Sequence, residues 1–244
     1  MVIINADDFG MNERCSRAIA EAFSRELVTD TTIMANGEYF NQAILLAEKN
    51  GFFRKIGIHL NITEGPPLTE DIKNLPDFVT DGQFNKRYNW DRKLTAEEET
   101  AIHRELTAQI VKVQKEGVRI THADSHHYIH NAPFIAPIAE RVCSEHGIAK
   151  IRLMRNWGDM ADSDKQKAEK YKERLRSKGY ITTEYFGRLS ETENKKPPES
   201  IELLVHPDFD KDGSLIDRHG VEGGYPVGSI IPELNVMLGG YLAL

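Results

Sequence analysis

The sequence predicts an α/β fold built on a parallel sheet, either one barrel or one doubly wound domain. Strand-like and helix-like segments alternate along the 244 residues, and each interval between strands has room for a crossover helix. Clusters of Asp and His follow short, β-branched apolar runs, which is where α/β folds place their reactive groups. The length suits a single domain that spans residues 1–244.

In the first part of the chain, β-branched runs are separated by apolar residues at helical spacing, as in Ala18, Ile19, Ala22 and Phe23. We expect strands over residues 2–6, 29–34 and 56–62, and helices over 13–27 and from 41 to about 51. The stretch from 64 to about 93 carries turn residues and little periodicity, and long loops of this kind often act as lids.

The second part of the chain opens with a helix signal. Thr95, with Glu98 three residues later, forms a capping box, and this helix should end at Gly117. Pro133 fits the first turn of another helix, which should end near Gly147. Further strands are expected over residues 118–121, 148–153, 181–185 and 201–205, with a strongly charged surface helix over 163–178.

Composition excludes several classes of protein. Acidic residues exceed basic ones by 38 to 31, and the net charge of −7 disfavours binding to nucleic acid. No run of about 18 apolar residues predicts a membrane span, and the first residues lack signal-peptide features, so we expect a cytoplasmic protein. Cys15 and Cys143 lack metal-ligand spacing, which favours reduced structural thiols. The apolar share would permit a homodimer.

A pair of carboxylates, Asp7 and Asp8, follows the first predicted strand. Adjacent strand residues point to opposite faces, so both can serve one site only if the strand has ended and the chain turns there. Phe9 and Gly10 support such a turn. The alternative is that one Asp caps the helix near residue 13 while the other is solvated.

Histidines follow three other predicted strands or lie within them. His59 alternates with apolar residues, and a lone histidine in such a strand is more often a hydrogen-bonded core residue than a ligand. A nine-residue segment then contains four imidazoles, at His122, His126, His127 and His130. Imidazole is a common metal ligand, and Asp124 could accept the hydrogen bond that fixes a tautomer. A helical turn after Ser125 would bring His126 and His130 to one face, so not all four can be ligands. His206 follows the last predicted strand. It could serve as an acid–base group, or it could form a hydrogen bond within the core.

With these motifs in view, the chain resembles the YdjC-like carbohydrate deacetylase family, best known for removing acetyl groups from chitooligosaccharides. The resemblance rests on four motifs, which are Asn5–Gly10, Thr31-Thr32 to Asn36-Gly37, Gly57–Asn61 with Thr63-Glu64-Gly65 and Pro67-Leu68, and Thr121–His127 with His130. It implies an irregular (β/α) barrel, similar to a TIM barrel with parallel strands but with fewer than eight regular units.

The resemblance also implies roles for individual residues. Asp8, His59 and His126 would hold one divalent metal ion, Asp7 would be the general base, and His206 would match a late catalytic histidine. The donor set suits zinc, although magnesium or manganese would also be accepted. The chain departs from the family where Asp208 follows the His-Pro pair, a position that usually holds Gly, and where the tail from about Gly220 lacks a charged closing helix.

The expected activity is therefore removal of an N-acetyl group from an amino sugar or short chitooligosaccharide, with or without a phosphate group. Tyr128 and Trp90 could stack on a sugar ring, although core positions are an alternative for both. Arg152 could anchor a substrate oxygen or form a salt bridge to a neighbouring helix. The alternatives are a metal-dependent phosphoesterase on the same barrel and a sugar-binding protein without turnover.

Overall fold

Six parallel strands form the central sheet of the computed structural model, which describes residues 1–86, 92–193, 195–219, 224–234 and 236–244. Every pairing between neighbours in this sheet is parallel. The strand order is β6 (Ala123–Ser125), β3 (Ile56–Leu60), β2 (Asp30–Ile33), β1 (Val2–Phe9), β8 (Ile201–Val205) and β7 (Tyr185–Arg188).

Two isolated parallel bridges connect the edges of this sheet. Ala123 of β6 pairs with Ile151, and Lys150 pairs with Ile181, four residues ahead of β7. The pairing therefore continues from β6 to Ile181, ahead of β7, and the backbone N–H of Asn156 donates to the Phe186 carbonyl within β7. The predicted irregular (β/α) barrel with parallel strands is confirmed.

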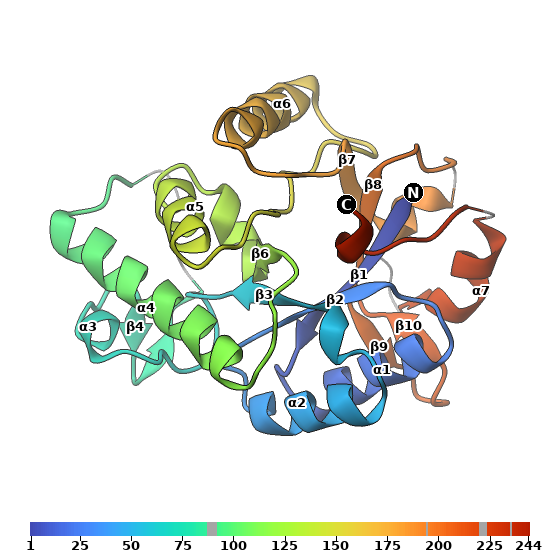
Figure 1. Ribbon diagram of the computed structural model, residues 1–244, viewed down its shortest axis with the longest axis horizontal. Helices are drawn as coiled ribbons and strands as arrows, with labels where there is room; N and C mark the ends of the chain where they lie inside the picture. Colours follow the sequence, from blue (N-terminus) through green and yellow to red (C-terminus); the bar gives the residue numbers. More distant parts are fainter. Residues whose placement is uncertain (87–91, 194, 220–223, 235) are drawn as a thin grey trace.

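Helices surround the sheet, as Figure 1 shows. β1 and β8 are buried along their whole length, which is typical of parallel strands that are covered on both faces. The helices are α1 (Glu13–Ser24), α2 (Phe40–Lys49), α3 (Glu70–Lys73), α4 (Ala96–Lys115), α5 (Ala136–Glu145), α6 (Asp162–Ser177) and α7 (Val227–Glu233). Within the described ranges, none of them combines the length and apolar character needed to cross a membrane.

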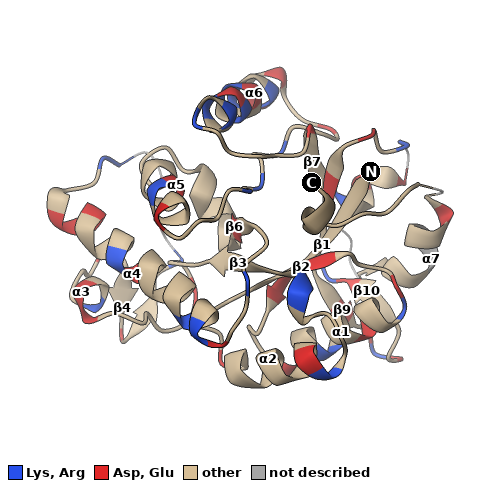
Figure 2. Cartoon of the chain, viewed as in Figure 1, with Lys and Arg blue, Asp and Glu red and all other residues tan. Residues whose placement is uncertain are grey.

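Local signals placed several of these helices correctly. The capping box of Thr95 and Glu98 is present at the start of α4, where both reciprocal hydrogen bonds form. α6 is the expected charged surface helix, and both signs of charge alternate along it in Figure 2. The two cysteines are buried and unpaired, as predicted.

Three predicted strands are displaced in the structure. The strand expected at 118–121 lies further along the chain, as β6 at Ala123–Ser125. There it pairs with β3, and Asp124 stands opposite His59. The strand expected at 148–153 is reduced to single bridges at Lys150 and Ile151. The one expected at 181–185 begins only at Tyr185, so β-branched composition alone did not fix where pairing occurs.

The long stretch after β3 contains local structure. The short helix α3 is followed by a two-stranded hairpin of β4 (Val79–Thr80) and β5 (Gln83–Phe84). A role as a lid stays a prediction.

Beyond β8 the chain forms a small antiparallel sheet of β9 (Pro207–Phe209), β10 (Leu215–Asp217) and β11 (Tyr225–Pro226). After α7, the tail returns to the amino end of the barrel, where Val2 pairs with Leu238. A final 3₁₀ turn, η4 (Tyr241–Ala243), ends the described chain. The two ends of the chain therefore lie close together, as Figure 1 shows.

Candidate metal centre and catalytic pocket

Asp7 and Asp8 lie inside β1 instead of after it. The strand continues to Phe9, but its pairing register with β2 shifts between Ala6 and Phe9, and Asp8 has a φ of +70°. Such a bulge breaks the alternation of side chains between the two faces of a sheet. The expectation that the strand ends before the pair was therefore wrong, and the irregularity lets both carboxylates line one cavity.

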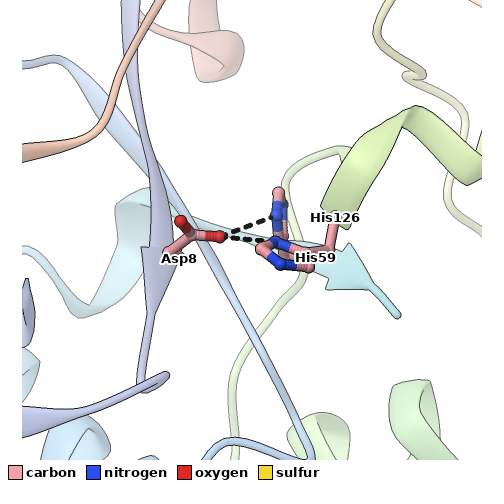
Figure 3. Close-up of side chains that lie close together, drawn as sticks. All are labelled: Asp8, His59 and His126. Carbon is pink, nitrogen blue, oxygen red and sulfur yellow. Dashed lines mark hydrogen bonds and ion pairs between the residues drawn. The ribbon is translucent and has the colours of Figure 1, made fainter. Parts of the chain in front are cut away.

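Asp8, His59 and His126 converge from β1, β3 and the segment after β6 (Figure 3). The Asp8 Oδ1 atom lies 3.1 Å from His59 Nε2 and 2.9 Å from His126 Nδ1. All three residues are buried, and their candidate donor atoms lie within 4.8 Å of one another. One carboxylate and two imidazoles in this arrangement form a donor set that fits a divalent metal ion.

The hydrogen bonds of His59 present the correct nitrogen to such an ion. Its Nδ1 lies 2.7 Å from Asp124 Oδ1, and the hydroxyl of Thr32 donates to Asp124 Oδ2 at 2.9 Å. A carboxylate that accepts a hydrogen bond from Nδ1 keeps the ring proton on that nitrogen. The lone pair of Nε2, the atom that faces Asp8, is then available to bind a metal ion. The prediction that Asp124 accepts a histidine hydrogen bond is confirmed, with His59 as its partner.

His126 begins the irregular 3₁₀ segment η2 (His126–Asn131), in which His127 and Tyr128 both adopt left-handed conformations, with φ of +51° and +57°. Two consecutive non-glycine residues in this region cost energy and tend to occur at functional sites. The His126 Nε2 atom lies 3.2 Å from Glu64 Oε2, and Glu64 pairs with Lys86 at 3.0 Å. We did not single out Glu64 from the sequence, although it lies in one of the motifs shared with the family.

The electrostatics of the cluster suit a positive ion beside Asp8. Burial raises the pKa of Asp8, but hydrogen bonds from His126 and His59 outweigh burial and hold this pKa well below its usual value. Burial lowers the pKa of His59, but the charge and hydrogen bond of Asp124 outweigh it and raise the pKa to about 10. Positive charge is therefore stabilised at this point of the barrel.

Asp7 is held as an ionised carboxylate. Its Oδ1 accepts hydrogen bonds from Arg152 Nη2 at 2.6 Å and Asn5 Nδ2 at 2.8 Å, and its Oδ2 accepts one from Arg152 Nη1 at 2.7 Å. Burial raises the pKa of Asp7, but the guanidinium outweighs burial and lowers that pKa. The bidentate pair also fixes the orientation of the carboxylate.

Arg152 is not placed to contact a substrate. Its exposure is 0%, and besides Asp7 it pairs with Asp124 and Glu202, each at 2.7 Å. The predicted substrate contact is thus replaced by salt bridges, and the partners lie on strands β1, β6 and β8 instead of on a neighbouring helix. The sequence could not reveal this, since the contact with Asp7 spans 145 residues.

A cavity of about 240 Å³ opens beside the cluster. His206, directly after β8, lies on its wall with its Nδ1 3.7 Å from Asp217 Oδ1, and Tyr128 lines it as well. The predicted substrate residue Trp90 falls outside the described residues. The lining comprises Asp7, Asp8, His59, Ser125, His126, His127, Tyr128, Arg188, His206 and His219.

His122 and His130 do not join the three candidate ligands. The buried His122 ring lies 3.1 Å from Asn5 Oδ1 through its Nε2, and His130 hydrogen-bonds to the Ser125 hydroxyl. Sequence reasoning missed Arg218, whose Nη2 donates to the second oxygen of Asp8. No pattern around Arg218 signalled this contact, which spans 210 residues.

Known proteins resemble this chain in sequence and in fold. A carbohydrate deacetylase from Brevibacillus brevis is 32% identical over 216 residues, which cover 85% of this chain and 81% of that protein. One from Listeria monocytogenes serotype 4a is 30% identical over 217 residues, with the same coverage. The crystal structure of an Enterococcus faecalis protein, proposed to cleave cellobiose phosphate, superposes with a TM-score of 0.73 at 22% identity and covers 99% of this chain and 97% of its own. That likeness shows the fold alone. The model of the YdjC-like protein family matches residues 1–225, and the chain therefore belongs to this family.

Proposed function

We propose that this protein is a metal-dependent carbohydrate deacetylase that removes the N-acetyl group from an amino sugar or short chitooligosaccharide, with or without a phosphate group. The observation that carries the proposal is the placement of Asp7 beside Asp8, His59 and His126, in one cavity. Relatives named carbohydrate deacetylase support the reaction class.

One divalent ion would be held by Asp8 Oδ1, His59 Nε2 and His126 Nδ1. Such an ion, when bound, lowers the pKa of a water molecule and polarises an acyl oxygen. The donor set favours zinc over magnesium, because imidazole is a better ligand for zinc.

Asp7 would take the proton from the attacking water. Its ionised state and its fixed orientation between Arg152 and Asn5 suit this role. His206 lies on the wall of the same cavity, and in its protonated form it would donate to the departing sugar amine. Acetate and a free amino sugar are the products.

The cavity beside the cluster is smaller than most ligand pockets and would hold one sugar ring. Tyr128 and Arg188 line it and would contact the ring and its polar substituents. Further sugars would extend into a second cavity of about 470 Å³, which is bordered by Glu64, Lys86 and the β2–α2 connection.

The decisive experiment measures acetate release from N,N′-diacetylchitobiose and its 6-phosphate. Metal-stripped protein is reloaded with zinc, magnesium or manganese, and the Asp7→Asn variant serves as the control. We expect metal-dependent release that the substitution abolishes, with metal binding retained. Phosphate release without acetate would point to a phosphoesterase, and no release despite bound metal would point to a binding protein.

A cytoplasmic location and a homodimer stay predictions from the sequence. Cell fractionation and size-exclusion chromatography coupled to light scattering would test them.

A further inference from the structure

The tail of the chain closes the amino end of the barrel, opposite the catalytic cavity. The backbone N–H of Val2 donates to Met237, and that of Gly239 donates to Val2, at 2.9 and 3.0 Å. The backbone N–H of Tyr241 reaches the Asp30 carboxylate at 3.2 Å, and Lys150 bonds to the Tyr241 carbonyl. These contacts insert the Tyr241 side chain, which is 1% exposed, into the barrel.

The hydroxyl of Tyr241 connects to the catalytic site through two charged groups. It donates to Glu202 Oε2, and the other oxygen of Glu202 accepts Arg152 Nε at 2.7 Å. The same guanidinium holds both oxygens of Asp7. Glu202 and Arg152 each have 0% exposure, so bulk solvent does not reach these contacts.

The ring of Tyr241 supports Asp7 from a second side. It stacks on His122 with the ring centroids 3.6 Å apart and the planes 8° from parallel. His122 Nε2 lies 3.1 Å from Asn5 Oδ1, and Asn5 Nδ2 donates to Asp7 Oδ1 at 2.8 Å. This contact fixes which end of the Asn5 amide faces Asp7.

We propose that Tyr241 is a positioning residue for the reaction, because its hydroxyl acts through Glu202 and Arg152, and its ring through His122 and Asn5, to orient the Asp7 carboxylate. Tyr241 lies outside residues 1–225, which the family model matches. The residues that follow this match thus complete the support of the base. Removal of the Tyr241 hydroxyl leaves a buried oxygen of Glu202 without a hydrogen-bond donor. Glu202 is then free to shift, and the Arg152 guanidinium that it holds shifts with it.

The first test uses thermal unfolding of the full chain saturated with zinc, and it does not depend on activity. Tyr241→Phe, Asp7→Asn and the double variant are compared with wild type. Residues that are far apart and share no partner change stability additively. We expect the fall in Tm of the double variant to be smaller than the sum of the two single falls. Additive falls would overturn the coupling.

The second test is kinetic and rests on the proposed deacetylase function. Tyr241→Phe should lower kcat for acetate release about 10- to 100-fold, as expected for a displaced catalytic group, while KM and zinc content stay unchanged. Tyr241→Leu, which also removes the stacked ring, should lower kcat further. A merely structural role would reduce Tm without this selective loss of kcat.

Tyr180→Phe is the matched control, because its hydroxyl also bonds within the protein, to the Glu140 carbonyl, but has no connection to Asp7. Unchanged kcat in Tyr241→Phe would refute the positioning role. If the wild-type protein releases no acetate, the proposed function fails, and the unfolding cycle still decides whether Tyr241 and Asp7 are coupled.

Discussion

Each of the three candidate metal ligands is held by a second charged side chain. His59 contacts Asp124, His126 contacts Glu64, and the outer oxygen of Asp8 contacts Arg218. Such partners fix the orientation of a ligand and usually matter nearly as much as the ligand itself. Of these partners, Glu64 is the most suitable for a test, since its side chain is 34% exposed and its removal leaves no large buried void.

Glu64→Ala should weaken zinc binding about 10-fold, because His126 loses the carboxylate that orients its ring and fixes its tautomer. Glu64→Gln keeps an acceptor oxygen at this position and should retain most of the affinity. Competition with a chromophoric chelator measures the zinc dissociation constant for each variant.

Lys86→Ala serves as the control for this pair. It removes the exposed cation that contacts Glu64 at 3.0 Å but leaves the carboxylate on His126 in place. Zinc affinity should therefore change little in Lys86→Ala. Equal affinities in Glu64→Ala and wild type would show that Glu64 does not orient this ligand.

At the scale of elements, β3 and the segment before β6 approach each other unusually closely. Gly57 of β3 has no side chain, and a Cβ built there would lie 2.6 Å from the His122 ring and 2.7 Å from its carbonyl oxygen. The backbone pairing of β3 with this segment leaves no room for movement, because Ile58 N–H donates to the His122 carbonyl at 2.9 Å. Glycine is required here by packing and not by an unusual φ.

Gly57→Ala should lower the free energy of unfolding by about 2 kcal/mol or more, because overpacking forces the His122 ring or the strand to shift. Urea denaturation monitored by circular dichroism measures this loss. Gly228→Ala is the control, since this glycine lies in α7 with open space around it and should be neutral or slightly stabilising. A loss in Gly57→Ala no greater than in the control would contradict the predicted clash.

At the scale of the whole molecule, the amino end of the barrel contains a buried carboxyl that titrates near neutral pH. Asp30, at the start of β2, is 1% exposed, and burial raises its pKa from 3.8 to about 6 despite hydrogen bonds from Thr29 and Tyr241 and the charges of Lys55 and Lys150. The folded state therefore binds a proton here at pH values where the unfolded chain has released it. The resulting stability is complete below about pH 4 and is lost as the pH rises through about 6.

Asp30→Asn removes this dependence. Between about pH 3 and pH 7, wild type should lose about 3 kcal/mol of unfolding free energy relative to the variant, which corresponds to the shift of about two pKa units. Urea unfolding of both proteins across this range gives the difference, and groups common to both cancel. A difference that does not vary with pH would show that the Asp30 pKa is not raised.

The sequence by itself determined much of this protein. Local periodicity and caps located several of the helices, as the Thr95 capping box shows for α4, because these signals depend on neighbouring residues. The motifs also placed clusters of Asp and His at the carboxyl ends of parallel strands, which meet at one end of a barrel, and the resemblance to the family implied Asp8, His59 and His126 as the ligands. Their convergence in the structure agrees with that reasoning.

Only the tertiary structure decided how these groups are oriented. The bulge at Asp8, the burial of Arg152 between three carboxylates and the insertion of Tyr241 depend on residues far apart in the chain. Asp7 and Arg152 are separated by 145 residues, and Asp8 and Arg218 by 210. No local pattern encodes such pairs, because their energy arises from desolvation and hydrogen bonding that exist only once the barrel has closed.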